Sequence, residues 1–199
     1  MNSTVIVAAG DFPKRGGCAY AQLEKATRVV CCDHAADLYR RRMGREPTVV
    51  IGDGDSVRGH FKNFVLCADQ DTNDLTKAIA YCAAQGWRKP LIVGATGGRE
   101  DHTLGNIFRA YAAGLELITD TGRFIPVEGS CSLEVGKGTA ISIFATDPET
   151  EMTSRGLVWP LTGVKFTDLF KATLNRASAA RIRLTATRRV YVFVAKRDK

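Results

Sequence analysis

The hydrophobic pattern divides the chain into two halves of different character. In the first half, short β-branched apolar runs alternate with stretches that carry apolar residues at helical spacing. The runs predict strands at residues 4–8, 28–32, 48–51, 64–67 and 90–93. The stretches between them predict helices at residues 19–26, 35–43, 74–85 and 102–113. Near-continuous apolar strands alternating with helices are typical of a mostly parallel sheet buried on both faces, so we expect an α/β doubly wound domain.

After about residue 114 the helical spacing fades and short alternating strands follow. Strands are predicted at residues 139–144 and 190–194, with turn residues at 128–130, 135–138 and 146–148. This pattern is typical of an antiparallel β-sandwich or barrel. We therefore expect an α/β domain over residues 1–120, followed by a C-terminal antiparallel β-sandwich over residues 121–199.

The net charge of +7 is concentrated at the carboxyl-terminal end. Residues 175–199 contain eight basic residues and one acidic residue, so the rest of the chain is neutral overall. These basic residues lie in or beside alternating strand patterns, which indicates either a solvated strand face or a nucleic-acid surface. Few aromatic residues lie among the charges, and we expect no nucleic-acid partner.

The six cysteines are scattered in or beside apolar segments and form no CxxC pair. Their spacing favours reduced thiols over a disulfide framework or a zinc site. The first four residues carry no basic side chain, and the apolar run at residues 5–9 is too short for a signal peptide or a membrane span. We therefore expect a cytoplasmic protein without membrane contact.

Acidic residues follow the predicted strands of the first half. Asp33 follows the second strand, Asp53 and Asp55 follow the third, and Asp69, Asp71 and Asp74 follow the fourth. Any one of them could be a turn former or a helix cap. Gathered at the carboxyl edge of one sheet, however, they would repel one another unless a cation held them. Mg²⁺ binds carboxylate and phosphate oxygens, so the cluster predicts a magnesium–phosphate site.

A glycine-rich segment at residues 94–102 runs from a strand end into a helix start. Glycines let the backbone approach a phosphate closely, a helix amino terminus offers free N–H groups, and Arg99 adds a planar cationic fork. The segment is neither a Walker A loop nor a dinucleotide fingerprint. His102 and Asn106 are four residues apart and share a helix face, and for His102 a positioning role is favoured over proton transfer.

Four blocks of this sequence resemble the thiamine pyrophosphokinase family, whose members transfer a pyrophosphoryl group from ATP to the hydroxyl of thiamine. The first is Pro47 to Ser56, with its Gly-Asp-Gly-Asp-Ser end, and the second is the Asp-Gln-Asp segment that leads to Asp74. The third is Gly94 to His102 together with Asn106. The fourth combines residues 156–161 with residues 173–175. The blocks follow the family's order along most of the chain.

The resemblance implies an α/β domain that binds ATP and Mg²⁺ and a β-sandwich that binds thiamine, in a homodimer with shared active sites. Asp53, Asp55 and Asp74 would hold Mg²⁺, with Asp33 nearby as a further catalytic carboxylate. The implied ATP and phosphate contacts are Gly97, Gly98, Arg99, Asp101, His102 and Asn106. The implied thiamine contacts are Trp159, Asn175 and Gln70.

The chain departs from the family's pattern at three places. Asp33-His34-Ala35-Ala36 stands where the family usually has Asp-Gly-Gly-Ala, Asn73 replaces a threonine, and Leu174 replaces a serine. Two alternatives to the enzyme therefore stay open. One is a non-catalytic nucleotide or thiamine-phosphate sensor, and the other is a Mg-dependent phosphohydrolase or nucleotidyltransferase that acts on another small substrate.

Overall fold

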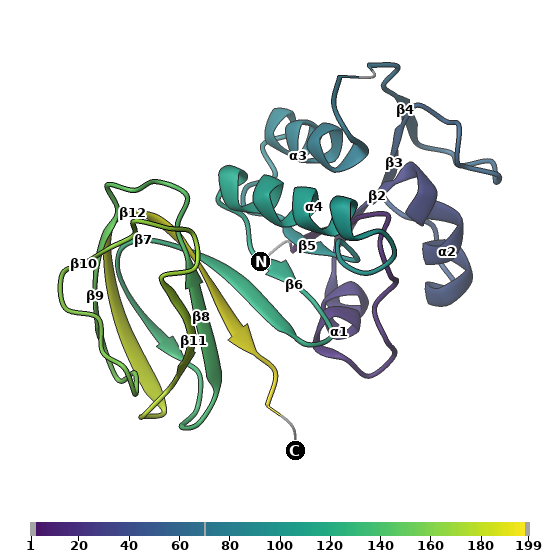
Figure 1. Ribbon diagram of the computed structural model, residues 1–199. Coiled ribbons are helices and arrows are strands. Elements are labelled where there is room, and N and C mark those ends of the chain that lie inside the picture. The colour runs from purple at the N-terminus through teal and green to yellow at the C-terminus, as the bar shows by residue number, and fades with distance from the viewer. Residues whose placement is uncertain (1–2, 70, 198–199) are drawn as a thin grey trace. The chain divides into compact units, whose positions relative to one another are not determined.

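The computed structural model describes residues 3–69 and 71–197 and divides into two compact units. Unit 1 is Met1–Asp120 and unit 2 is Thr121–Lys199. Unit 1 is an α/β structure and unit 2 consists of strands (Figure 1). This arrangement confirms the predicted fold class.

Unit 1 alternates strands and helices along the chain. Its strands are β1 (Thr4–Val7), β2 (Arg28–Cys32), β3 (Val49–Gly52), β4 (Phe64–Leu66), β5 (Leu91–Val93) and β6 (Leu117–Ile118). Its helices are α1 (Cys18–Lys25), α2 (Asp33–Met43), α3 (Asp74–Ala84) and α4 (Glu100–Ala113). The predicted elements are all present, whereas the two-residue strand β6 was missed because so short an apolar pair carries no periodicity.

The strands of unit 1 form a parallel sheet in the order β4-β3-β2-β1-β5-β6. Successive side chains of a strand point to opposite faces, so each inner strand needs cover on both sides. The cluster around Val5, Val7 and Cys31 packs against Leu23 of α1 and Tyr39 of α2. Figure 1 shows α3 and α4 on the other side of this sheet. The sheet is therefore doubly wound, as the apolar strands predicted.

Local sequence explains where the helices begin and end. The side chain of Asn73 caps α3 by accepting a hydrogen bond of 2.9 Å from the Thr76 backbone N–H. Helices α2 and α4 end at Gly44 and Gly114, whose φ angles of 65° and 64° lie in the left-handed region that glycine adopts without a steric penalty. Asn73 thus supplies a side-chain cap at the position where the family usually has threonine.

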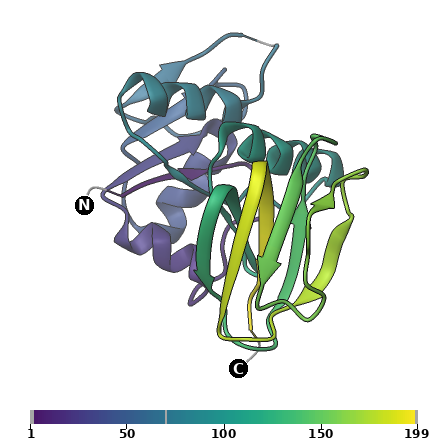
Figure 2. The same ribbon diagram turned by 90° about the vertical axis from the view of Figure 1, so that its left-hand side faces the viewer.

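Unit 2 is built on two long strands that bend through both of its layers. Its strands are β7 (Gly122–Glu134), β8 (Ala140–Phe144), β9 (Glu151–Arg155), β10 (Val164–Lys165), β11 (Ala172–Arg176) and β12 (Arg181–Ala195). Figure 2 shows β7 and β12 side by side along unit 2. The first half of β12 pairs with β9, and its second half pairs with β8, all antiparallel. The two layers enclose one apolar core that includes Ile143, Met152, Phe166 and Ile182.

The turn predicted at residues 128–130 was wrong, because these residues continue β7. Gly129 has a φ of 71° and lies where the register with β12 shifts between Ala186 and Val190. The glycine therefore marks a bulge that bends a continuous strand from one layer into the other. No helix in the described part of the chain is long and apolar enough to cross a membrane.

Candidate active site

A pocket of about 820 Å³ opens in unit 1 at the carboxyl ends of its strands. The sheet order reverses between β1 and β5, and ligands of open α/β sheets bind at such a reversal. The backbone N–H of Gly10, after β1, donates to the Gly94 carbonyl, after β5, at 2.7 Å. A Cβ on Gly10 would lie 2.5 Å from the Thr96 carbonyl oxygen, so only glycine permits this close approach.

Asp33 is a buried carboxylate at the first position of α2, with 1% of its surface exposed. Its Oδ2 accepts a hydrogen bond of 2.8 Å from the Gly54 backbone N–H, whereas its Oδ1 is buried without a hydrogen-bond partner among the described residues. A Cβ on Gly52 would collide with the Asp33 side chain. Burial, and then the charges of Asp55 and Asp53, raise the pKa of Asp33 against the opposing effect of the Gly54 hydrogen bond.

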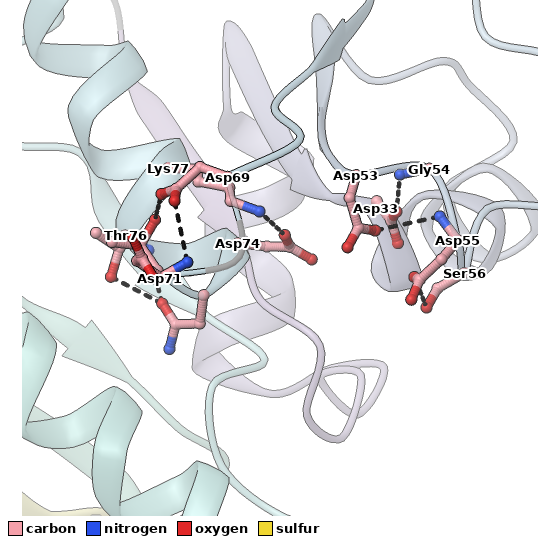
Figure 3. Close-up of polar contacts among 12 residues, drawn as sticks. Asp33, Asp53, Gly54, Asp55, Ser56, Asp69, Asp71, Asp74, Thr76 and Lys77 are labelled. Carbon is pink, nitrogen blue, oxygen red and sulfur yellow. Dashed lines mark hydrogen bonds and ion pairs between the residues drawn. The ribbon is translucent and has the colours of Figure 1, made fainter.

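Asp53 and Asp55 lie in the loop after β3 and face Asp33 (Figure 3). One carboxylate oxygen from each of these three residues lies within 4.8 Å of the others. The Asp55 backbone N–H donates to Asp53 Oδ1 at 3.2 Å, and the Ser56 hydroxyl donates to Asp55 Oδ1 at 2.7 Å. Three carboxylates so close together are mutually repulsive without a cation.

This loop is fastened to helix α2 by Asp37. Its Oδ2 accepts backbone hydrogen bonds from Arg58 at 2.8 Å and from Gly59 at 3.2 Å, and its Oδ1 accepts from the Arg40 guanidinium at 3.1 Å. The backbone hydrogen bond from Arg58 is the main reason why the pKa of Asp37 is lowered. Asp37 therefore holds the loop that carries Asp53 and Asp55 against the helix that carries Asp33.

Asp74, the first residue of α3, lines the pocket but stands apart from the group of three. Figure 3 shows its carboxylate pointing towards Asp53 and Asp33. The Lys77 ammonium lies 3.5 Å from Asp74 Oδ1, and only 7% of the Lys77 side chain is exposed. Burial and then the charge of Asp33 raise the pKa of Asp74, and Lys77 opposes this shift. The family resemblance implied Asp53, Asp55 and Asp74 as the Mg²⁺ ligands, whereas Asp33 is the third member of the compact group.

Asp69 and Asp71, the two acidic residues of the Asp-Gln-Asp segment, precede α3. Asp69 accepts hydrogen bonds from the Asp71 backbone N–H at 3.0 Å and from the Thr72 hydroxyl at 2.6 Å. Asp69 therefore holds Asp71 and Thr72, which line the pocket. Gln70, an implied thiamine contact, lies outside the described residues.

The glycine-rich segment forms the side of the pocket that begins α4. Gly97 and Gly98 line the pocket with φ angles of 83° and 69°. A Cβ on Gly97 would collide with the carboxylate of Asp11, whereas a Cβ on Gly98 would meet no atom within 4 Å. Gly97 is therefore needed both for its backbone conformation and for space, and Gly98 leaves an open approach to the backbone.

Arg99 and Asp101 form an exposed two-pronged pair at this rim. Arg99 Nε donates to Asp101 Oδ1 at 3.1 Å, and the Arg99 Nη2 donates to Asp101 Oδ2 at 2.6 Å. The pKa of Asp101 is lowered by its hydrogen bond with Arg99. Arg99 lines the pocket, and Asp101 orients its guanidinium through Nε and Nη2. A guanidinium has five N–H donors, so others can bind an anion.

His102 and Asn106 both line the pocket from α4. His102 is exposed. Asn106 is buried, and its Nδ2 donates to the Ala95 carbonyl at 3.0 Å. This bond ties the glycine-rich segment to the helix, so Asn106 shapes the segment.

Helix α2 explains why the Asp33-His34-Ala35-Ala36 segment needs no glycine. The helix begins at Asp33, and none of residues 34–36 has a positive φ angle. Ala35 and Ala36 are buried in the core against the sheet, whereas His34 is exposed and lines the pocket. Small side chains are required at 35 and 36 by packing, and the segment keeps a regular helical backbone beside Asp33.

Trp159 and Asn175 belong to unit 2. The Trp159 side chain is among the exposed large hydrophobics, with 61% of the residue exposed. Asn175 is 5% exposed and is hydrogen-bonded to the Trp159 backbone at both the N–H and the carbonyl. Val158, Phe170 and Leu174 are also exposed apolar residues of this unit.

Comparison with known proteins assigns the family. The family description "Thiamin pyrophosphokinase, catalytic domain" matches residues 20–118, and "Thiamin pyrophosphokinase, substrate-binding domain" matches residues 122–193. The chain belongs to the thiamin pyrophosphokinase family. The two matched regions follow each other along most of the chain and correspond to its α/β and β-rich parts.

Individual thiamin pyrophosphokinases agree with this assignment. Thiamine pyrophosphokinase 1 of Oryza sativa is 28% identical over 182 residues, which cover 76% of this chain and 67% of that protein. The solved structure of yeast thiamin pyrophosphokinase has a TM-score of 0.79 at 16% identity, covering 98% of this chain and 86% of that one. A thiamin pyrophosphokinase family protein from Enterococcus faecalis has a TM-score of 0.78 at 17% identity, covering 99% and 100%. At these identities the structural matches establish the shared fold.

The carboxylate group has the chemistry of a site for a hard divalent cation. Oxygen donors of Asp33, Asp53 and Asp55 converge, and the buried Oδ1 of Asp33, which has no hydrogen-bond partner in the described part of the chain, can accept a cation. These residues therefore fit Mg²⁺.

Two further pocket residues, Lys77 and His34, were not predicted from the sequence. For Lys77 a signal was available, because residues three apart on a helix, such as Asp74 and Lys77, lie on the same face.

Proposed function

We propose that this family member is a thiamine diphosphokinase, which transfers a pyrophosphoryl group from ATP to the hydroxyl of thiamine. One observation carries the proposal: in a chain with both family domains, Asp53 and Asp55 of the carboxylate group line the same pocket as the glycine–arginine segment. The first suits a metal bound to phosphates, and the second suits the phosphates themselves.

In the proposed reaction, the thiamine hydroxyl oxygen forms a bond to the β-phosphorus of ATP. The bond between that phosphorus and the α–β bridging oxygen breaks, AMP leaves with the bridging oxygen, and the hydroxyl proton is released. Such phosphoryl chemistry depends on alignment and on neutralisation of charge. Each residue assigned below contributes to one of these two effects.

Asp33, Asp53 and Asp55 would hold Mg²⁺, and Asp74 would complete the acidic side of the site. Bound there, Mg²⁺ would supply neutralisation of phosphate charge. Gly97, Gly98 and Arg99 would bind phosphate oxygens, and Asp101 would orient Arg99. His102 would position the same segment, and Asn106 would fix its backbone through Ala95.

Unit 2 would supply the thiamine end of the site. Trp159 offers an exposed aromatic face, which suits a cationic heterocycle such as the thiazolium ring. We further propose a homodimer with shared active sites, in which each site combines Trp159 of one subunit with the carboxylates of the other. Six free thiols are consistent with action in the reducing cytoplasm.

The subunit arrangement is testable by mixing two inactive variants. Asp55→Asn and Trp159→Ala proteins are unfolded together, refolded together and assayed for thiamine-dependent AMP release. Shared sites predict regained activity, because each heterodimer contains one site with both wild-type residues. If each site is built within one chain, every site carries a lesion and activity stays at the parental level.

The reaction itself is tested by AMP release from ATP with Mg²⁺, measured with and without thiamine. The proposed enzyme releases AMP only when thiamine is present. A sensor would bind its ligands without releasing AMP, and a phosphohydrolase or nucleotidyltransferase on another substrate would give products that do not depend on thiamine. Either of these outcomes would contradict the proposal.

A further inference from the structure

The segment that carries Trp159 continues the antiparallel pairing of unit 2 beyond its named strands. Leu157 forms a β-bridge with Ala177, and the Val158 backbone N–H donates to the Arg176 carbonyl at 2.8 Å. In an antiparallel register, Trp159 therefore lies opposite Asn175, near the end of β11.

The Asn175 carboxamide holds the Trp159 backbone at both of its polar groups. Its Oδ1 accepts a hydrogen bond from the Trp159 N–H at 3.2 Å, and its Nδ2 donates to the Trp159 carbonyl at 2.7 Å. Oδ1 also accepts from the Arg176 N–H at 2.8 Å. Both lone pairs of the amide oxygen are thus used within the protein, and the residue is 5% exposed.

The two residues differ sharply in what they offer to a ligand. Trp159 is 61% exposed, and its backbone N–H and carbonyl are both hydrogen-bonded to Asn175. Asn175 is buried, and its amide oxygen already accepts two hydrogen bonds. A residue whose backbone is held in this way loses less conformational entropy when a ligand binds to its side chain. The contacts therefore suit Asn175 to orienting Trp159 and leave it little capacity to contact a ligand itself.

We infer that Asn175 is a positioning residue, which promotes thiamine binding by fixing the backbone of Trp159 and does not contact thiamine. This inference rests on the proposed function and on the proposed thiamine role of Trp159. It reassigns Asn175, which the family resemblance had placed among the thiamine contacts. The adjacent Leu174 is consistent with this role, because the residue is 85% exposed whereas the neighbouring Asn175 is buried.

A double-mutant cycle tests the inference. Thiamine affinity is measured for the wild type, Asn175→Ala, Trp159→Ala and the double variant, each with Mg²⁺ and ATP analogue present. We expect Asn175→Ala to weaken thiamine binding about 10-fold when Trp159 is present and less than about 2-fold when residue 159 is alanine. An equal loss in both backgrounds would show a direct contact with thiamine and would overturn the inference.

The orientation of Trp159 is measured separately from activity. The chain has two tryptophans, and Trp87→Phe leaves Trp159 as the only one. In that background, Asn175→Ala is expected to lower the fluorescence anisotropy of Trp159 in the free protein. Unchanged anisotropy would overturn the inference, because the clamp would then not hold the ring.

Two controls make the result specific. Asn63→Ala removes a different asparagine-to-backbone bond, from Nδ2 to the Thr48 carbonyl at 3.0 Å, and is expected to change neither readout. If Asn175→Ala fails to fold, Asn175→Ser replaces it in both experiments, with the same expected results. If the wild type binds no thiamine, the proposed function is contradicted. If the wild type binds thiamine and Asn175→Ala weakens binding equally with and without Trp159, only the role of Asn175 is contradicted.

Discussion

The carboxylate of Asp33 accepts a hydrogen bond of 2.8 Å from the backbone amide of Gly54, which joins the start of α2 to the loop after β3. This bond uses Oδ2, and Asp33 also offers one carboxylate oxygen to the group formed with Asp53 and Asp55. One side chain therefore both positions the acidic loop and contributes an oxygen to the proposed cation site.

Replacement of Asp33 by asparagine separates these two roles. The amide of Asp33→Asn can still accept from Gly54 but offers no second anionic oxygen. We expect turnover to fall at least ~100-fold while the melting temperature stays the same or rises, because a buried charge beside two other carboxylates is removed. Steady-state AMP release and thermal unfolding measure the two effects. A variant with near-normal turnover would remove Asp33 from the cation site.

Asp55→Asn is expected to lower turnover by a similar factor of at least ~100, again without unfolding the protein. Asp55 is exposed and its carboxylate accepts a hydrogen bond from the hydroxyl of Ser56, so its structural contribution is small. The matched control is Ser56→Ala, which removes that hydrogen bond but no charge and should cost far less activity. Equal losses in both variants would assign the effect to loop structure instead of charge.

Lys77 is expected to matter because its ammonium is a buried cation on the acidic side of the pocket. Lys77→Met leaves Asp74 beside Asp33 and Asp53 without its 3.5 Å partner. Turnover should fall by roughly 10- to 100-fold, and Lys77→Arg should retain more activity than Lys77→Met because it keeps the charge. Comparison of kcat for the two variants checks this. Equal activity of the methionine variant and the wild type would contradict the role given to Lys77.

Arg99→Lys keeps a positive charge but loses the planar fork that Asp101 orients. The KM for ATP is expected to rise, with a smaller effect on the KM for thiamine. Asp101→Asn, which disturbs the same pair from the other side, should shift the KM for ATP in the same direction. Equal changes for both substrates in either variant would count against a phosphate role for Arg99.

Asp37 gives a pH dependence of stability whose sign follows from its lowered pKa. A carboxyl group with a lowered pKa in the folded state stabilises above its unfolded pKa of about 4, and this contribution is lost as the pH falls through the folded pKa. Asp37→Asn should therefore reduce the free energy of unfolding at pH 7 by about 1–2 kcal/mol and by less near pH 3, which lies below the unfolded pKa. Urea unfolding at both pH values tests this, with the exposed Glu149→Gln as control. A difference that stayed constant with pH would contradict it.

The strand–helix alternation of unit 1 could be predicted because its inner strands are buried on both faces, as Val5, Ile6 and Val7 of β1 show with no exposed surface at all. The bulge at Gly129 could not, since a glycine between two alternating runs looks the same whether the chain turns back or a strand bends. Residue type and position along the chain were sufficient to select Asp53, Asp55 and Arg99 as candidates, and all three line the pocket.

Other features of the site depend on contacts between segments that are far apart in the sequence. The hydrogen bond that holds Asp33 to the acidic loop, for example, joins Asp33 to Gly54, 21 residues away. Likewise, the hydrogen bonds of Asn175 to Trp159 span 16 residues, so its residue type alone could not distinguish a ligand contact from a clamp.

The most direct test of the proposed activity follows the β-phosphate of ATP. Protein, Mg²⁺, thiamine and ATP labelled at the β-phosphorus are incubated together, and the products are separated and quantified. Transfer of a pyrophosphoryl group predicts equal amounts of AMP and thiamine diphosphate, with all of the transferred label in thiamine diphosphate. Accumulation of ADP with thiamine monophosphate, or release of labelled pyrophosphate independent of thiamine, would contradict it.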